Sequence, residues 1–204
     1  MKKIALAALF CTVFHPAVAA TVSLTENFDD LNGWTPASHG SYAHVIADPT
    51  GGSGNVLAFA SGNSAGDIFS LGTFTSGYIN FDYFGAAALG SSGGGFVGIS
   101  AGLPGTHQWL AGSSPHNGTP MSLVNNGTWN HYSIAFNAAN VGAGAAHLML
   151  EQFSTNIPNQ AYFRNLTVSD TPLAAVPEPE TYAMLLAGLG LIGFSLRRRQ
   201  AAAR

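Results

Sequence analysis

Cysteine and positive charge are both scarce in this 204-residue chain. The single cysteine, Cys11, lies in an apolar stretch near the amino terminus, so the rest of the chain has no thiol for a disulfide, a thiolate metal site or a nucleophile. Between Thr21 and Val176, Arg164 is the only lysine or arginine and stands among eight acids, a net charge of −7 with neutral histidines. Such a segment is not expected to bind nucleic acid, because that binding needs clustered lysines and arginines.

The amino terminus has the pattern of a secretory signal peptide. Two lysines precede an apolar run of eleven residues, Ile4 to Phe14, which is too short for a permanent membrane-spanning helix. The small residues Ala17-Val18-Ala19 then fit a signal-peptidase site. We therefore predict that residues 1–20 are a signal peptide, cut by signal peptidase after Ala19 or Ala20, and that the domain behind it is exported.

The carboxyl terminus carries three features in order: Pro177-Glu178-Pro179, an uncharged run of fifteen residues from Tyr182 to Leu196, and the cluster Arg197, Arg198 and Arg199. A helix over the run is about 22 Å long, short of a hydrocarbon core of roughly 30 Å. The arginines are expected on the cytoplasmic side. The sequence thus predicts a linker at 173–181 and a single, marginal C-terminal transmembrane helix with its arginine cluster at 182–204.

This tail resembles the PEP-CTERM sorting domain of Gram-negative bacteria, in which the same three features end the chain. The resemblance implies recognition by a membrane-embedded exosortase, transient residence in the inner membrane, removal of the tail, and delivery to the cell surface or the exterior. It also implies a setting rich in extracellular polysaccharide. An ordinary C-terminal anchor is the alternative.

Short apolar runs separated by turn residues fill the segment between the termini, and none keeps a helical period. In "YINFDYF", Ile79, Phe81 and Tyr83 share one face of an expected strand, and Asp82 lies on the other. The pattern predicts one all-β domain over residues 21–172, an antiparallel β-sandwich of the jelly-roll type. Its expected strands are Val22–Phe28, Tyr42–Ala47, Val56–Ala60, Ile68–Phe74, Gly77–Phe84, Phe96–Ala101, Met121–Val124, Trp129–Phe136, Ala146–Phe153 and Ala161–Ser169.

A second resemblance concerns this domain. The segments "ENFDDLNGWT", "NGTWNHYSIAF" and "AYFRNLTV", in this order, resemble jelly-roll domains of the carbohydrate-binding and concanavalin-like type. The resemblance implies a structural calcium held by an opening acid and a final-strand aspartate. Arg164 stands where that aspartate is expected, which argues against calcium, and we predict no metal site and no cofactor. We expect Arg164 to pair with Glu26 or Asp29 and so to join the first and last strands.

Two kinds of functional residue are candidates. Exposed aromatic side chains can stack on the apolar faces of sugar rings, although aromatic residues of sandwiches more often lie in the core. The candidates for stacking are Trp34, Trp109, Trp129 and Tyr78. A glycosidase needs two carboxylates about 5 to 10 Å apart, and Asp82 and Glu151, each in the middle of an expected strand, are the candidate pair.

The histidines show no metal-ligand spacing, and no segment shows a catalytic motif. We therefore predict a non-enzymatic protein of the cell surface or extracellular matrix, sorted by an exosortase, with a domain that is a candidate for carbohydrate binding. The alternative is a glycan-active hydrolase that uses Asp82 and Glu151.

Overall fold

The computed structural model describes residues 21–36, 43–60, 65–71, 75–89, 93–101, 106–113, 119–142, 146–153, 160–173 and 187–189. The predicted signal peptide, the Pro-Glu-Pro motif, the arginine cluster and most of the C-terminal apolar run lie outside these residues. Within the described ranges, no helix is long and apolar enough to cross a membrane.

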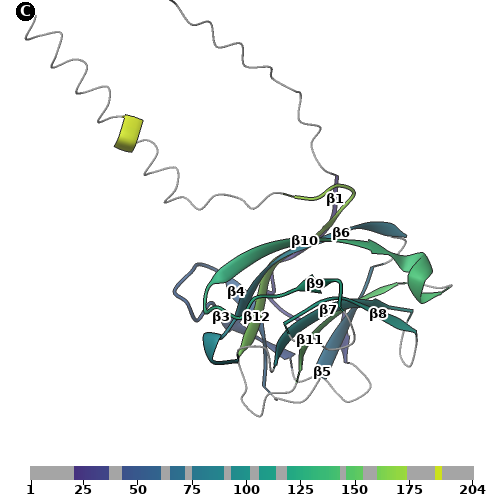
Figure 1. Ribbon diagram of the computed structural model, residues 1–204, viewed down its shortest axis with the longest axis horizontal. Helices are drawn as coiled ribbons and strands as arrows, with labels where there is room; N and C mark the ends of the chain where they lie inside the picture. Colours follow the sequence, from purple (N-terminus) through teal and green to yellow (C-terminus); the bar gives the residue numbers. More distant parts are fainter. Residues whose placement is uncertain are drawn as a thin grey trace, which may run out of the picture.

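Two β-sheets stacked face to face make up the domain (Figure 1). Sheet A consists of β1 (Val22–Glu26), β3 (Ala43–Ala47), β4 (Asn55–Phe59), β6 (Ser76–Gly85), β10 (Trp129–Asn137) and β12 (Ala161–Ser169). Sheet B consists of β2 (Trp34–Pro36), β5 (Ala65–Ser70), β7 (Gly94–Ser100), β8 (His107–Gly112), β9 (Met121–Ser122) and β11 (His147–Phe153). Two short 3-10 helices, η1 (Ala87–Leu89) and η3 (Ala138–Val141), lie in connections.

The strand order is that of a jelly roll. Sheet A runs β10-β6-β12-β4-β3, with β1 also paired to β12, and sheet B runs β2-β5-β11-β7-β8-β9. From β4 to β12 the chain changes sheet at nearly every connection, so strands that neighbour each other in one sheet are distant in sequence. Apart from the short β8–β9 pair, the paired strands that the structure describes are antiparallel. The predicted antiparallel β-sandwich is confirmed.

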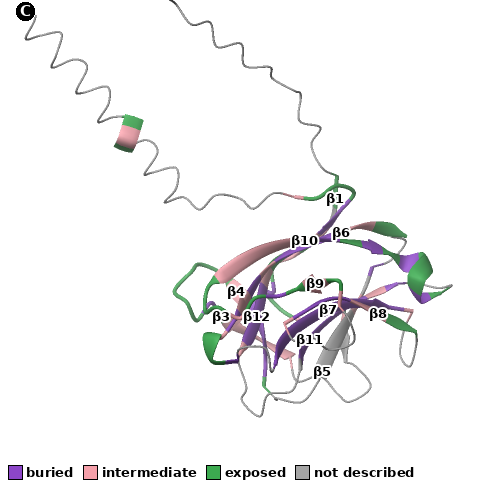
Figure 2. Ribbon diagram, in the orientation of Figure 1, coloured by how far each residue is buried: buried purple, intermediate pink, exposed green. Residues whose placement is uncertain are grey.

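Alternation along the strands builds the core between the sheets (Figure 2). On β6, Ile79, Phe81 and Tyr83 are fully buried against sheet B, as their spacing predicts. Phe163 of β12 joins them, with ring centroids 5.3 Å from Tyr83 and 5.8 Å from Phe81. Each such side chain contributes roughly 1.5–3 kcal/mol by leaving water. The residues between them, including Asp82, must therefore point away from sheet B.

Two strands of sheet B were not expected from the sequence. β2 has three residues, one of them Pro36, and is a strand only because β5 pairs with it. β8 pairs with β7 across a bulge opposite Val97 and Gly98, which breaks the simple alternation that sequence patterns detect. β5 begins at Ala65, three residues earlier than the expected start.

Candidate functional site

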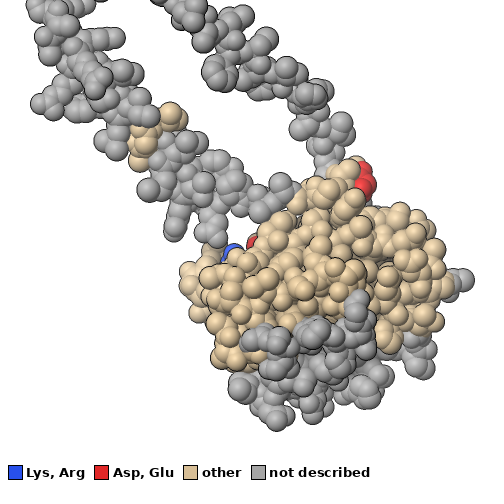
Figure 3. All heavy atoms as spheres, in the orientation of Figure 1, with Lys and Arg blue, Asp and Glu red and all other residues tan. Residues whose placement is uncertain are grey.

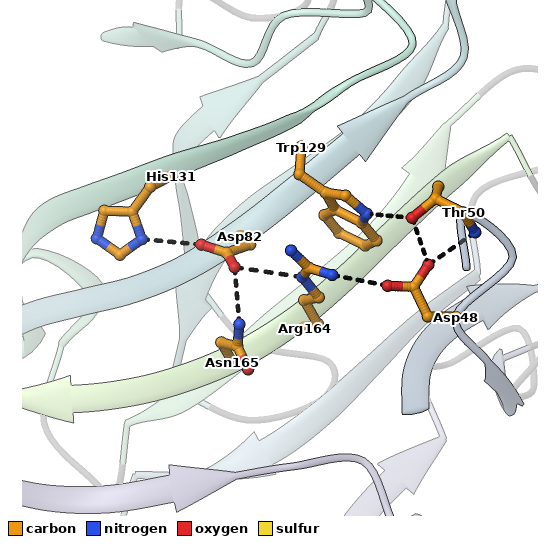
Figure 4. Close-up of polar contacts among 7 residues, drawn as sticks. All are labelled: Asp48, Thr50, Asp82, Trp129, His131, Arg164 and Asn165. Atoms are coloured by element: carbon orange, nitrogen blue, oxygen red, sulfur yellow. Dashed lines mark hydrogen bonds and ion pairs between the residues drawn. The ribbon is translucent and has the colours of Figure 1, made fainter. Parts of the chain in front are cut away.

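Arg164 is the centre of the outer face of sheet A (Figure 4). Because its neighbour Phe163 points into the core, Arg164 points outward. Its Nη1 donates to Asp48 Oδ2 at 2.6 Å, and its Nε donates to Asp82 Oδ2 at 3.3 Å. The guanidinium carbon lies 4.1 Å from the ring centroid of Trp129, a cation–π geometry.

Thr50 closes this arrangement into a ring. Its backbone N and its Oγ1 donate to Asp48 Oδ1 at 2.8 and 2.7 Å, and its Oγ1 accepts from Trp129 Nε1 at 2.8 Å. Burial raises the pKa of Asp48, but the hydrogen bonds from Thr50 and Arg164 outweigh it, so that the pKa lies below its usual value. The side chain of Asp48 has no exposed area and yet remains a carboxylate at neutral pH.

Asp82 extends the network along the sheet. It accepts from Asn165 Nδ2 at 2.7 Å and contacts His131 Nδ1 at 2.9 Å. Asn165 has φ 53°, a left-handed conformation at the bulge in β12 that turns its amide toward Asp82. His131 Nε2 lies 3.1 Å from the carbonyl oxygen of Leu173. The charged groups of this face are thus paired with one another by ion pairs and hydrogen bonds.

The predicted pairing of Arg164 with Glu26 or Asp29 is wrong. Arg164 lies directly across from Asp82 on β6, whereas β1 pairs with β12 only from Leu166 onward. Glu26 instead accepts from Phe28 N at 2.7 Å and from Trp34 Nε1 at 3.2 Å. The only cation of the domain therefore joins β12 to β6 and to the turn after β3.

The four aromatic candidates have different surroundings. Trp34 packs against Phe28 and Phe69, with ring centroids 6.0 and 5.3 Å away, and serves the edge of the core. Trp129 is engaged by the guanidinium of Arg164. Tyr78 is half-buried on β6. Trp109 lies on the other sheet, where the ring of His107 meets its indole at a centroid distance of 5.7 Å.

Trp109 lies flat against the outer face of sheet B. A Cβ added to Gly98, its partner on β7, would lie only 2.8 Å from Cε3 of the indole, so the absence of a side chain there makes room for the ring. The ring of Phe96 meets the indole edge-on, with centroids 5.6 Å apart. The backbone at Gly98 and the rings of Phe96 and His107, the latter with its centroid 5.7 Å from the indole, hold the half-buried indole in one orientation.

Glu151 lies beside these rings. Leu148 and Leu150 point into the core, so Met149 and Glu151 of β11 point outward, where Glu151 is the cross-strand partner of Phe96. Glu151 is 9% exposed, and no described residue hydrogen-bonds its carboxyl group. Burial raises the pKa of Glu151 to about 7. We call Phe96, Gly98, Trp109, Met149 and Glu151 the Trp109 patch.

The predicted glycosidase pair of Asp82 and Glu151 is also wrong. Asp82 points outward from sheet A and Glu151 points outward from sheet B. Packed sheets lie about 10 Å apart, so the two carboxyl groups are separated by the whole sandwich and cannot flank one glycosidic bond.

A calcium ion does not fit the residues around Arg164, because its guanidinium already pairs with both Asp48 and Asp82. Within the described ranges, no three His, Cys, Asp or Glu side chains lie close enough together to hold a metal ion. Charge is sparse elsewhere as well, and most of the described surface in Figure 3 carries neither acid nor base.

Comparison with known proteins identifies the tail. Residues 175–199 match the family described as the PEP-CTERM protein-sorting motif. They form a PEP-CTERM sorting signal. This confirms the interpretation of the C-terminal sequence. No curated protein matches the chain.

Several solved structures are similar in shape to the domain. A family 11 carbohydrate-binding module of the cellulase Lic26A-Cel5E of Clostridium thermocellum has 15% identity and a TM-score of 0.42, covering 78% of this chain and 100% of that one. The CBM22 tandem domain of Paenibacillus barcinonensis Xyn10C has 16% identity and a TM-score of 0.47, covering 81% and 49%. The K2 cleaved adhesin domain of Lys-gingipain has 12% identity and a TM-score of 0.46, covering 71% and 98%.

Replacing Arg164 by Gln is expected to lower the free energy of unfolding by about 3 kcal/mol, because two carboxylates lose their cation and one of them is fully buried. Adding Asp48→Asn to this variant removes the unpaired buried charge. The double variant should therefore lose less than the two single variants together. Urea denaturation at pH 7 measures all four proteins, and strictly additive losses would contradict the network.

Replacing Glu151 by Gln is expected to stabilise the protein at pH 8 and to have little effect at pH 4. The pKa of Glu151 is higher in the folded chain than the value of 4.5 in the unfolded chain, so its contribution to stability decreases as the pH rises from 4.5 to about 7 and stays lost above. Glutamine stays neutral and avoids this loss of about 3 kcal/mol.

Thermal unfolding of the two proteins between pH 4 and pH 8 measures this difference. Asp29→Asn, which removes an exposed carboxylate, is the matched control and should show no such trend. An equal effect of Glu151→Gln at both ends of the pH range would mean that Glu151 is well solvated.

Proposed function

We propose that this protein is exported, held for a time in the inner membrane by its C-terminal tail, cut there by an exosortase, and delivered to the cell surface or the exterior. The match of residues 175–199 to the PEP-CTERM motif supports this route. We propose further that the β-sandwich binds polysaccharide through the Trp109 patch and does not cleave it.

The orientation of Trp109 carries the proposal of sugar binding. Sugar rings present apolar C–H faces, and a flat indole that is already fixed loses little conformational entropy when it stacks on one. Gly98 and Phe96 fix the ring of Trp109 in this way. Binding sites for small polar molecules combine such apolar surface with a few placed polar groups, and the unpartnered carboxyl of Glu151 is one.

The outer face of sheet A suits sugar binding less well. Among the aromatic residues of this face, Trp129 packs against Phe84, already has a guanidinium against its ring, and donates its indole N–H to Thr50. Asp48 and Asp82 are both paired with Arg164. A sugar would have to compete with these interactions, whereas on sheet B it would find a carboxyl group without a described partner.

The proposal that the domain binds polysaccharide without cleaving it rests on the number of acidic residues on the outer face of sheet B. Hydrolysis of a glycosidic bond generally uses two carboxyl groups on opposite sides of the bond. In the described strands, the register places a single acid, Glu151, on the outer face of sheet B.

Replacing Trp109 by Ala is expected to weaken polysaccharide binding by about 2 kcal/mol, roughly thirtyfold, because the stacking surface is lost. Trp129→Phe, which keeps a ring on the opposite face, is the control and should bind as the unaltered protein does. Affinity electrophoresis in gels that contain polysaccharide measures both variants. If Trp129→Phe lost binding and Trp109→Ala kept it, the site would lie on sheet A.

Deleting Pro177 to Pro179 is expected to leave the protein uncut and retained in the inner membrane of its own host, because the exosortase would lack its recognition motif while the apolar run would remain. Fractionation and immunoblotting show both the size and the location of the product. Replacement of Glu180 by Gln, just outside the Pro-Glu-Pro tripeptide, is the control. Release of the deleted form at normal processed size would contradict the sorting route.

A further inference from the structure

The strand register fixes how the carboxyl group of Glu151 and the indole of Trp109 lie on sheet B. Glu151 pairs with Phe96, and the next outward pair along the same two strands is Met149 with Gly98. The indole of Trp109 covers Gly98. Successive outward pairs are about 7 Å apart along a strand. A sugar ring stacked on the indole would therefore bring its hydroxyl groups toward the Glu151 carboxyl.

No charged group in the described strands faces Glu151. β7 contributes Phe96 and Gly98, β5 contributes the backbone of Gly66, and β11 contributes Met149. The titratable residues on the same outer face are His147, further along β11, and His107, exposed near the start of β8. With no cation or hydrogen-bond donor from the described residues to stabilise its charged form, the buried carboxyl group favours the neutral acid.

A neutral carboxylic acid differs from a carboxylate in what it can bind. It donates one hydrogen bond through its O–H and accepts through its other oxygen, so it can serve both lone pairs and hydroxyl protons of a sugar. It also carries no charge that a neutral ligand would have to desolvate further. A carboxylate in the same place would only accept, and it would repel an acidic sugar.

On the basis of the proposed function, we propose that the protonated Glu151 carboxyl group hydrogen-bonds a hydroxyl of the sugar stacked on Trp109. The patch thereby releases polysaccharide as the pH rises and, once the carboxyl group is ionised, binds uncharged polysaccharides in preference to acidic ones. The ligand buries the acid further, so binding and proton uptake favour each other. This is linkage between two ligands, the sugar and the proton, and it is reciprocal.

The magnitude follows from the same linkage. If the bound sugar raises the pKa of the carboxyl group by one unit, the affinity for a neutral polymer falls about tenfold between acid and alkaline pH. The pH range lies around neutrality, since the pKa of Glu151 is already about 7 without ligand. A polymer of uronic acids gains a like-charge repulsion as the Glu151 carboxyl group ionises over the same range, so its affinity is expected to fall more steeply with rising pH than that of the neutral polymer.

Binding to laminarin and dextran as neutral polymers, and to alginate and polygalacturonate as uronic acid polymers, tests the proposal. The exported, processed protein is measured by isothermal titration calorimetry at pH 5.5 and 8.5. At least one neutral polymer should bind about tenfold more tightly at pH 5.5 than at pH 8.5, and the uronic acid polymers should bind more weakly than this neutral polymer at pH 8.5. Glu151→Gln, a neutral isostere, should bind the neutral polymer equally at both pH values, with about the affinity of the unaltered protein at pH 5.5.

Asp29→Asn is the control for loss of an acid and should keep the pH dependence. Binding that Trp109→Ala weakens but that does not change with pH, or a pH dependence that survives Glu151→Gln, overturns the role of Glu151 and leaves the sugar site in place. Tighter binding of the uronic acid polymers than of the neutral polymer at pH 8.5 also overturns the selectivity. Absence of binding to all four polymers at both pH values overturns this proposal and counts against the sugar site itself.

Discussion

The pairing of Arg164 with Asp48 and Asp82 is the interaction on which sheet A depends. Asp48 has no exposed side-chain area, so its charge can be accommodated only with a cation and hydrogen bonds in place. Arg164 supplies the cation from β12, and Thr50 and Trp129 complete the ring from the turn after β3 and from β10. Removing one partner of such a buried pair costs about 3–5 kcal/mol, far more than an exposed ion pair contributes. One residue thus connects three segments that are distant in sequence.

The two outer faces of the sandwich differ in whether their acidic side chains are paired. On sheet A each carboxylate has partners, and the cation among them also covers an indole. On sheet B the acid lies next to Phe96 and Met149, has no partner among the described residues, and favours its neutral form. A face whose charges are satisfied gains little from a polar ligand, whereas a face with an unpartnered acid beside a fixed indole gains hydrogen bonds. This difference in electrostatics supports the proposal of a sugar site on sheet B.

Sequence patterns predicted correctly those features that depend only on residues close together in the chain. The alternation in "YINFDYF" assigned Ile79, Phe81 and Tyr83 to one face, and the order of motifs identified the sorting tail. The partner of Arg164 could not be predicted, since it depends on which strands of the jelly roll are adjacent, and Asp82 is 82 residues away. For the same reason Asp82 and Glu151 seemed able to meet although they point to opposite sides. The platform under Trp109 depends on a glycine of another strand, which alternation alone does not reveal.

The ends of the domain explain how such a chain can lose both termini and keep its fold. Thr21 precedes β1 and Asp170 follows β12, and the two residues hydrogen-bond each other: Thr21 N donates to Asp170 Oδ1 at 2.9 Å, and Asp170 N donates to Thr21 O at 3.2 Å. The backbone of Leu173 is held at both of its polar groups. Its N–H donates to Asn80 Oδ1 at 3.1 Å, and its carbonyl oxygen lies 3.1 Å from His131 Nε2. These bonded residues lie inside the predicted signal-peptidase cut and ahead of the sorting motif, which begins at residue 175. Cleavage after Ala20 would also give Thr21 an ammonium group beside the Asp170 carboxylate, whose pKa the hydrogen bonds from Thr21 already lower. The proposed processing at both termini would thus leave the two new chain ends at the same end of β1 and β12, and no described contact of the core would be lost.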